Sequence, residues 1–221
     1  MNSYNNAEDA FESYYYKIMG GGEDVGNGTK AMYNVSFEIL DPLARTITTE
    51  WRNFKKEYAE HEFDWYESGD RTFHLIGDAA KIWCLMGDPI NSNYGYQIRR
   101  NEQFGKVVNL LAEDPHTRRA VITVYDGKEI DNYKDDTPCL LSLTFSIDKC
   151  NKLHMSVHFR SQDLVYGFCN DNYTLVEYFV RVYRLLKYKR YPELKMGRTH
   201  WFINNLHIYE KHWDMRTKTI K

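Results

Sequence analysis

The stretch from Arg160 to Tyr173 reads Arg-Ser-Gln-Asp-Leu-Val-Tyr-Gly-Phe-Cys-Asn-Asp-Asn-Tyr and gathers polar side chains between two apolar segments. The residues before it have the pattern of a β-strand, and the residues after it are apolar over the length of a helix. The chain therefore leaves a strand, crosses Gly167 and enters a helix. A dense set of charged and amide groups lies at this junction, between segments that belong to the core.

Cys139 stands upstream of this stretch, after a proline, where the strand-like segment 140–147 begins. A second strand pattern at 153–159 follows a polar turn and leads into Arg160. Because antiparallel neighbours meet at one end of a hairpin, we expect Cys139 and Arg160 to lie together. A guanidinium lowers the pKa of a nearby thiol, which favours a nucleophile; a lone cysteine is otherwise inert core.

The bulk properties narrow the class of protein. With 221 residues, of which 43% are hydrophobic and 15% aromatic, the chain is expected to form one domain spanning 1–221. Its net charge of -2 gives no reason to expect direct binding of nucleic acid or of a membrane surface. The four cysteines lack metal-binding spacing, so we expect reduced thiols and no metal. No signal peptide and no membrane span are recognisable, which predicts a cytoplasmic location.

Strands and helices alternate without regular βαβ units, which predicts an α+β fold with a mixed sheet packed by helices. The predicted helices cover 7–19, most of 50–67, 104–111 and 173–186. The predicted strands cover 33–39, 120–125, 140–147, 153–159 and 206–209. In the first strand, Tyr33, Val35, Phe37 and Ile39 alternate with polar residues and should share a buried face.

Two basic groups are candidates for binding a phosphate. Arg160 and Ser161 offer a guanidinium fork and a hydroxyl. Arg118 and Arg119 precede a predicted strand and can add charge-assisted hydrogen bonds to a dianion, although such arginines are usually just exposed.

Three other side chains are candidates for the site, although each, taken alone, is more often structural. Glu62 lies late in a predicted helix, where a glutamate most often faces solvent. His207 and Tyr209 alternate along one predicted strand and so point to the same face, where they can hold a sugar hydroxyl.

Taken together, these pieces resemble the thymidylate synthase superfamily over most of the chain. The segments that carry the resemblance are Glu62-Phe63-Asp64-Trp65-Tyr66, Asn93-Tyr94-Gly95, Asp114-Pro115-His116-Thr117-Arg118-Arg119, Thr137-Pro138-Cys139, Arg160-Ser161-Gln162-Asp163 and Leu206-His207-Ile208-Tyr209. The resemblance implies a thymidylate synthase-like fold, with a sheet face forming the interface of a homodimer that shares its active sites. It also implies a pyrimidine nucleoside monophosphate as substrate and 5,10-methylenetetrahydrofolate as co-substrate.

The same resemblance implies roles for the candidate residues. Cys139 would add to C6 of the pyrimidine, and Glu62 would organise water and move protons. The 5′-phosphate would be held by Arg160 and Ser161, and by Arg118 and Arg119 of the partner subunit. The ribose would meet His207 and Tyr209, and the folate side would hold Trp83, Tyr94 and Asp163.

One position departs from the synthases and changes the expected base. Synthases have an asparagine four residues after the glycine of this motif, where its amide pairs with uracil; here the residue is Asp171, next to Asn170. Cytosine presents an N4 amino donor and an N3 acceptor. A carboxyl group accepts from N4 and, when protonated, donates to N3, so Asp171 predicts a cytosine nucleotide.

Residues 167–171 and 90–95 are similar to the phage deoxycytidylate 5-hydroxymethylases of this superfamily. That resemblance implies a reaction in which water captures the transferred methylene group, in the cytoplasm of a host if the gene belongs to a phage. A CMP hydroxymethylase, a synthase acting on dUMP and an inactive nucleotide-binding protein remain alternatives. The family's N-terminal phosphate-binding arginine has no arginine counterpart around 24–30, where Lys30 is the candidate substitute.

Overall fold

A mixed sheet forms the middle of the computed structural model, which describes residues 2–77 and 79–218. Its main strand order is β1-β3-β8-β6-β5-β4, while β2 pairs with β3 and β7 with β8. The strands are β1 Asn2–Tyr4, β2 Glu23–Asp24, β3 Thr29–Ile39, β4 Val121–Thr123, β5 Leu140–Ile147, β6 Lys152–Phe159, β7 Gln162–Asp163 and β8 Lys195–Tyr209. Strands β6 and β7 run parallel to β8, whereas β3 and β8 are antiparallel, which confirms the predicted mixed sheet.

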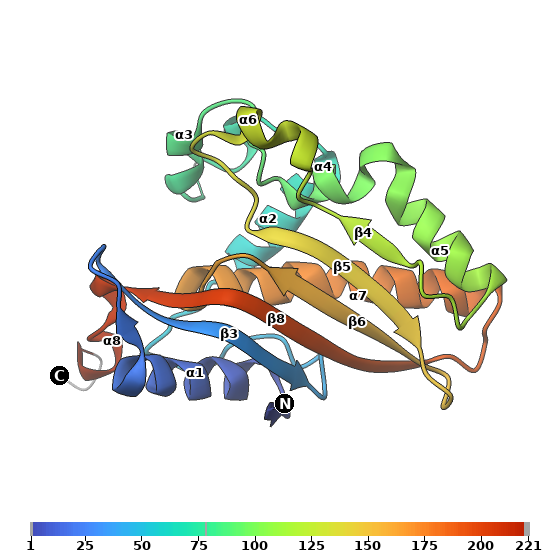
Figure 1. Ribbon diagram of the computed structural model, residues 1–221, viewed down its shortest axis with the longest axis horizontal. Coiled ribbons are helices and arrows are strands. Elements are labelled where there is room, and N and C mark those ends of the chain that lie inside the picture. The colour runs from blue at the N-terminus through green and yellow to red at the C-terminus, as the bar shows by residue number, and fades with distance from the viewer. Residues whose placement is uncertain (1, 78, 219–221) are drawn as a thin grey trace.

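Helices cover one face of this sheet. They are α1 Ala7–Gly21, α2 Lys56–Ser68, α3 Ile82–Met86, α4 Tyr94–Arg99, α5 Gln103–Glu113, α6 Ile130–Tyr133, α7 Cys169–Lys189 and α8 Met215–Lys218. In Figure 1, α7 crosses behind the strands, and no helix among the described residues crosses in front of them. The predicted α+β architecture is therefore confirmed. None of the helices in the described part of the chain is long and apolar enough to cross a membrane.

An aromatic core holds the start of α7 against the sheet. Trp201 of β8 is fully buried and stacks on Phe159 of β6 and on Phe37 of β3, with ring centroids 5.9 and 6.2 Å apart. Phe168 meets the same indole edge-on at 5.1 Å. Because Phe168 ends the π-helical turn η4, Leu164–Phe168, this contact fixes where α7 begins. The polar junction seen in the sequence is thus anchored by core packing.

The uncovered face of the sheet carries half-buried polar and aromatic side chains. His158 of β6 stacks on Phe202 of β8 with ring centroids 4.9 Å apart. His154 and His200 lie beside each other on the same two strands, with ring centroids 5.9 Å apart.

The boundaries of several elements differ from those predicted. Helix α2 begins at Lys56 rather than near residue 50, because Asn53 adopts a left-handed backbone with φ of 50°. Helix α7 begins at Cys169, so Asp171 lies in its first turn instead of in a loop. Tyr33 is exposed, contrary to prediction, because Asn34 also has a positive φ of 52° and breaks the alternation there.

Strand β8 is far longer than the predicted 206–209. Its inward positions include Gly197 and Thr199, which give no hydrophobic alternation. A Cβ at Gly197 would lie 2.3 Å from the carbonyl oxygen of Leu153, so only glycine fits at this position beside β6.

Candidate active site

A cavity of about 410 Å³ opens between the end of the sheet, helices α2 and α3, and the start of α7. It brings together most of the residues predicted from the sequence. Those that line it are Glu62, Trp83, Tyr94, Cys139, Arg160, Ser161, Asp163, Asn170, Asp171, His207 and Tyr209. Its volume is in the range typical of sites that bind a small organic ligand.

Cys139 and Arg160 meet at the open end of the β5–β6 hairpin, as the strand pattern predicted. Leu140 pairs with Phe159 in the hairpin register, and the N–H of Arg160 donates to the carbonyl oxygen of Cys139 at 3.0 Å. The guanidinium also donates from Nη2 to the carbonyl oxygen of Thr137 at 2.7 Å. Its Nη2 atom lies 3.7 Å from Sγ of Cys139.

The predicted lowering of the Cys139 pKa is wrong. Burial raises the pKa of the thiol, and Asp171 and Asp136 add to that effect. Arg160 opposes it but does not outweigh it. The thiol is therefore protonated at neutral pH, and a base or a bound ligand must promote formation of the thiolate.

Glu62 projects from α2 into the cavity and is almost completely buried. The hydroxyl of Tyr58, one helical turn earlier, donates to Oε1 of Glu62 at 2.8 Å. Oε2 of Glu62 is buried and has no hydrogen-bond partner among the described residues. Burial raises the pKa of this carboxyl to about 7, although the hydrogen bond from Tyr58 opposes the rise. A carboxyl that titrates near neutrality can both accept and donate a proton in catalysis.

Asp171 lies in the first turn of α7, and its side chain is also buried. Nε2 of Gln162 donates to Oδ2 of Asp171 at 3.0 Å. Burial raises the pKa of Asp171 well above its ordinary value, and the nearby Glu62 raises it further. The raised pKa favours the neutral form of the carboxyl, which has both a donor and an acceptor oxygen to offer a ligand.

The end of β8 supplies His207 and Tyr209, whose rings meet edge-on with centroids 5.1 Å apart. Both point toward the cavity, as the alternation predicted. Nδ1 of His207 lies 3.0 Å from Oδ1 of Asn205, and burial lowers the pKa of the imidazole. A neutral imidazole and a phenol are suited to hydrogen-bonding an uncharged hydroxyl.

Asp163 has a local structural task besides facing the cavity. Its carboxylate accepts hydrogen bonds from the N–H groups of Val165 and Tyr166, each at 3.0 Å, and so caps the η4 turn. Strand β7 holds Asp163 opposite His207.

Apolar and aromatic side chains form the outer wall of the cavity. Trp83 packs on Trp65 with ring centroids 5.1 Å apart, and Ile82 lies next to it on α3 with half of its surface exposed. Leu85 of the same short helix is 79% exposed. An exposed apolar wall beside a polar floor is suited to binding a flat heterocycle, because the ligand would remove this apolar surface from water.

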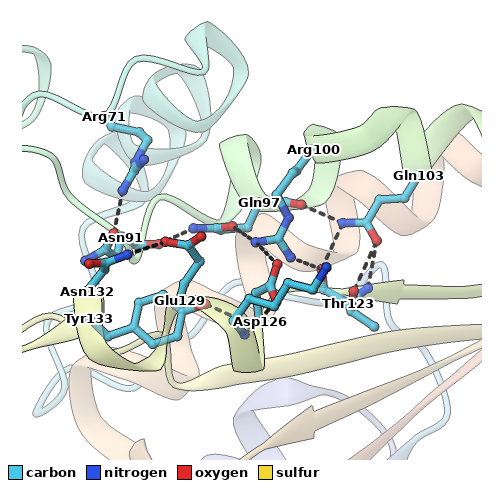
Figure 2. A network of polar contacts seen from close by, with 11 residues as sticks. Arg71, Asn91, Gln97, Arg100, Gln103, Thr123, Asp126, Glu129, Asn132 and Tyr133 are labelled. Carbon is cyan, nitrogen blue, oxygen red and sulfur yellow. Dashed lines mark hydrogen bonds and ion pairs between the residues drawn. The ribbon is translucent and has the colours of Figure 1, made fainter.

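A polar network anchors the segment that leads into Cys139. Figure 2 shows Arg100 and Gln103 reaching toward Asp126 and Thr123; Nη1 of Arg100 lies 3.3 Å from Asp126, and Nε2 of Gln103 donates to the Thr123 carbonyl oxygen at 2.8 Å. Closer to the cysteine, the buried Asp136 accepts from the N–H of Ser92 at 3.0 Å. These contacts tie the segment before Cys139 to the start of α4.

Three predicted phosphate ligands lie outside the cavity. Lys30 of β3 places its ammonium over the ring of Trp213, 4.8 Å from the centroid. Arg118 and Arg119 are exposed before β4 and do not line this chain's cavity. Within one chain, the described structure therefore brings only Arg160 and Ser161 of the predicted phosphate ligands to the site.

Two contacts of the acidic residues were missed from the sequence. Tyr58 stands four residues before Glu62, a spacing that places both on one helix face, and this signal was available. Gln162 belongs to the quoted stretch, but its contact with Asp171 depends on the η4 turn folding back, which no periodicity reveals. The described residues contain no cluster of three or more side chains suited to hold a metal ion.

Comparison with known proteins places the chain in a family. The family model described as thymidylate synthase matches residues 22–221. The deoxycytidylate 5-hydroxymethyltransferase of Enterobacteria phage T4 is 31% identical over 170 residues, which cover 71% of this chain and 68% of the relative. The corresponding enzyme of Enterobacteria phage T2 matches equally well. A thymidylate synthase of Streptococcus pyogenes serotype M5 (strain Manfredo) is 26% identical over 135 residues, covering 60% of this chain and 46% of the relative.

The match of the family model extends over the cavity, the hairpin and the first turn of α7. The buried acids, the cysteine beside an arginine and strands β2 to β8 of the mixed sheet all lie within the matched residues. The chain therefore belongs to the thymidylate synthase family, a family of folate-dependent one-carbon transferases.

Proposed function

We propose that this protein is a deoxycytidylate 5-hydroxymethyltransferase. It would convert dCMP, 5,10-methylenetetrahydrofolate and water to 5-hydroxymethyl-dCMP and tetrahydrofolate. The observation that carries the proposal is Asp171, a buried carboxyl with a raised pKa that lines the same cavity as Cys139 and Glu62. The 31% identity to the phage T4 enzyme of that name supports the same choice.

The edge of the base decides between cytosine and uracil. One oxygen of the Asp171 carboxyl can accept from the N4 amino group of cytosine, while the protonated oxygen donates to N3. The hydrogen bond from Gln162 occupies a lone pair of Oδ2, which favours placing the proton on Oδ1. We therefore assign Oδ2 to the N4 amino group and Oδ1 to N3. Polar groups left unpaired by the wrong base cost a factor on the order of 10⁴ in selectivity.

The residues of the outer wall fit the co-substrate. Trp83 and Ile82 offer aromatic and apolar surface to a pterin, and Tyr94 and Asp163, which line the same cavity, would also lie on the folate side. Methylenetetrahydrofolate supplies the one-carbon unit when it is bound.

The side chains of the chain would then act in sequence. Cys139 adds through Sγ to C6 of the pyrimidine, which makes C5 nucleophilic, and C5 takes up the one-carbon unit. Glu62 would accept the proton that leaves C5 when the bond between the one-carbon unit and the tetrahydrofolate nitrogen breaks, and it would orient the water whose oxygen then adds to the methylene carbon. Loss of the Cys139 sulfur from C6 restores the aromatic base. As the sulfur adds to C6, the Asp171 carboxyl would give its proton to N3, and the resulting carboxylate would stabilise the N3-protonated intermediate.

The phosphate and ribose contacts extend the proposal to a homodimer. Arg160 and Ser161 would grip the 5′-phosphate, Asn170 the base or its neighbouring water, and His207 and Tyr209 the ribose. Arg118 and Arg119 would reach the phosphate of the partner's site, since they are exposed and lie outside their own cavity. The uncovered sheet face of Figure 1 would form the interface. Lys30 would have to leave the ring of Trp213 to contribute to the phosphate site.

We further propose that residues 1–221 act as one catalytic domain, in the cytoplasm, on free nucleotides, and that the product would serve the synthesis of modified phage DNA. A CMP hydroxymethylase is the first alternative, because His207 and Tyr209 do not by themselves distinguish deoxyribose from ribose. A synthase acting on dUMP is the second, supported by the streptococcal relative.

Incubation with methylenetetrahydrofolate and dCMP, CMP or dUMP, each tritiated at C5, tests these alternatives. We expect tritium release from dCMP and a product heavier than unlabelled dCMP by CH2O, because a hydroxymethyl group replaces the C5 hydrogen. Release from dUMP alone would refute the cytosine assignment. Formation of dihydrofolate would refute the hydroxymethylase reaction, whichever base is used. Release from CMP in preference to dCMP would select the ribonucleotide alternative.

A further inference from the structure

A chain of three side chains connects the outer wall of the cavity to Glu62. Nε1 of Trp83 donates to the hydroxyl oxygen of Tyr58 at 3.0 Å, and that hydroxyl donates to Oε1 of Glu62 at 2.8 Å. All three side chains line the same cavity. The contact therefore runs from the proposed folate wall directly to the proposed acid–base residue.

The chemistry of the three groups fixes the direction of each hydrogen bond. An indole N–H is only a donor, so the oxygen of Tyr58 must accept from Trp83. The single hydroxyl proton of Tyr58 is then directed at Oε1 of Glu62. Oε1 is an acceptor whether Glu62 is ionised or protonated, and the proton of the neutral carboxyl must reside on Oε2.

Oε2 is also the atom that lacks a partner. It is buried and makes no hydrogen bond with any described residue. A buried carboxyl oxygen without a partner is costly unless a ligand or a water completes its hydrogen bonds. One oxygen of Glu62 is thus held by the protein, and the other is left for the reaction.

We propose that Tyr58 is a positioning residue that commits Oε1 of Glu62, so that Glu62 gives and takes protons through Oε2 alone. Trp83 completes the arrangement by orienting the Tyr58 hydroxyl. Contacts at the folate wall are thereby coupled to the acid–base group. This inference rests on the proposed function only in taking Glu62 as the residue that moves protons, and it is independent of which base is bound.

Tyr58→Phe removes the hydroxyl while keeping the ring. We expect the pH midpoint of kcat that reports Glu62 to move up by about one unit, because a hydrogen bond to the ionised carboxyl is lost. We also expect kcat for tritium release from C5 to fall about tenfold, the usual order for a misplaced acid–base group, with KM for the nucleotide little changed. Tyr178→Phe is the matched control, since Tyr178 is a buried tyrosine of α7 that does not line the cavity.

A titration that needs no turnover separates this inference from the proposed function. Protein labelled with ¹³C in the glutamate carboxyl groups is followed by NMR, and the Glu62 signal is assigned by its loss in Glu62→Gln. The titration midpoint of Glu62 should lie near pH 7 in the wild type. It should be higher in Tyr58→Phe, and it should rise by a smaller amount in Trp83→Phe. In the double variant, Trp83→Phe should add no further shift.

An unchanged Glu62 midpoint in a folded Tyr58→Phe protein would overturn the inference, even if thermal stability fell. Absence of turnover with every nucleotide would instead refute the proposed function and leave the titration result standing.

Discussion

Arg160 and Cys139 lie against each other at the open end of the β5–β6 hairpin, joined by a 3.0 Å backbone hydrogen bond, with Nη2 3.7 Å from Sγ. The guanidinium donates hydrogen bonds to the carbonyl oxygens of Thr137 and Pro138, and it therefore does not act as a full counter-ion for the sulfur. Proximity to a cation and activation as a thiolate are therefore separate properties of this cysteine.

Alkylation should be slow at Cys139 at pH 7 and should accelerate about tenfold per pH unit, because only the thiolate reacts and burial raises the thiol pKa above its ordinary value. The rate of iodoacetamide modification of each cysteine, measured by peptide mass spectrometry, checks this. Cys150, exposed in the hairpin turn, is the internal reference. A rate at Cys139 that is already independent of pH below 8 would contradict the protonated thiol.

Cys139→Ser should reduce tritium exchange at C5 by at least about a thousandfold, because a serine hydroxyl is a far weaker nucleophile at neutral pH. Cys150→Ser, which changes an exposed thiol, should leave the exchange unchanged. Retained turnover in Cys139→Ser would exclude a covalent mechanism through this residue.

Asp171→Asn should shift the preference between dCMP and dUMP toward dUMP by a factor on the order of 10² or more, since an amide matches the uracil edge. The ratio of kcat/KM for the two nucleotides is the measurement. Asn172→Leu removes a buried amide one residue away that does not line the cavity, and it should leave that ratio unchanged. An unaltered ratio in Asp171→Asn would show that this side chain does not read the base.

Glu62→Gln should stabilise the protein at alkaline pH. Burial raises the pKa of Glu62 from 4.5 to about 7, so the folded state retains a proton that the unfolded chain loses in this interval. The stabilising contribution of the neutral carboxyl is present below pH 4.5 and is lost as the pH rises through 7. Urea unfolding should therefore show the variant more stable than wild type by about 3 kcal/mol at pH 8, with little difference near pH 4. An equal difference at both pH values would mean that Glu62 does not titrate as described.

Hybrid dimers test whether the subunits share their sites. One parent would be Cys139→Ser and the other a double variant with Arg118→Ala and Arg119→Ala, each nearly inactive alone. A mixed dimer contains one site with both an intact cysteine and the partner's intact arginines, so equal mixing should restore about one quarter of the wild-type activity. Absence of recovery after subunit exchange is confirmed would refute shared sites.

The hairpin of β5 and β6 was predictable because inward apolar residues alternate over both strands, and the position of Cys139 beside Arg160 followed from it. The start of α7 was misplaced because Asn170, Asp171 and Asn172 are poor helix formers, and packing against the sheet overrides that propensity. The contact of Gln162 with Asp171 depends on the η4 turn between them folding the chain back, so no pattern of residue types could reveal it. The electrostatic outcome at Cys139 required the depth of burial, which the sequence does not carry.

The hairpin geometry also predicts which changes in chain length this site can survive over evolution. Its two ends behave differently: the turn at residues 148–151 is far from the cavity, whereas the open end holds the cysteine and the arginine. An insertion in the turn keeps both strands in register and leaves the pair intact. A one-residue insertion inside either strand would invert the side chains between it and the site, or displace one partner along the sheet. Variation in length among homologues should therefore collect at the turn, while the strands keep a fixed count of residues.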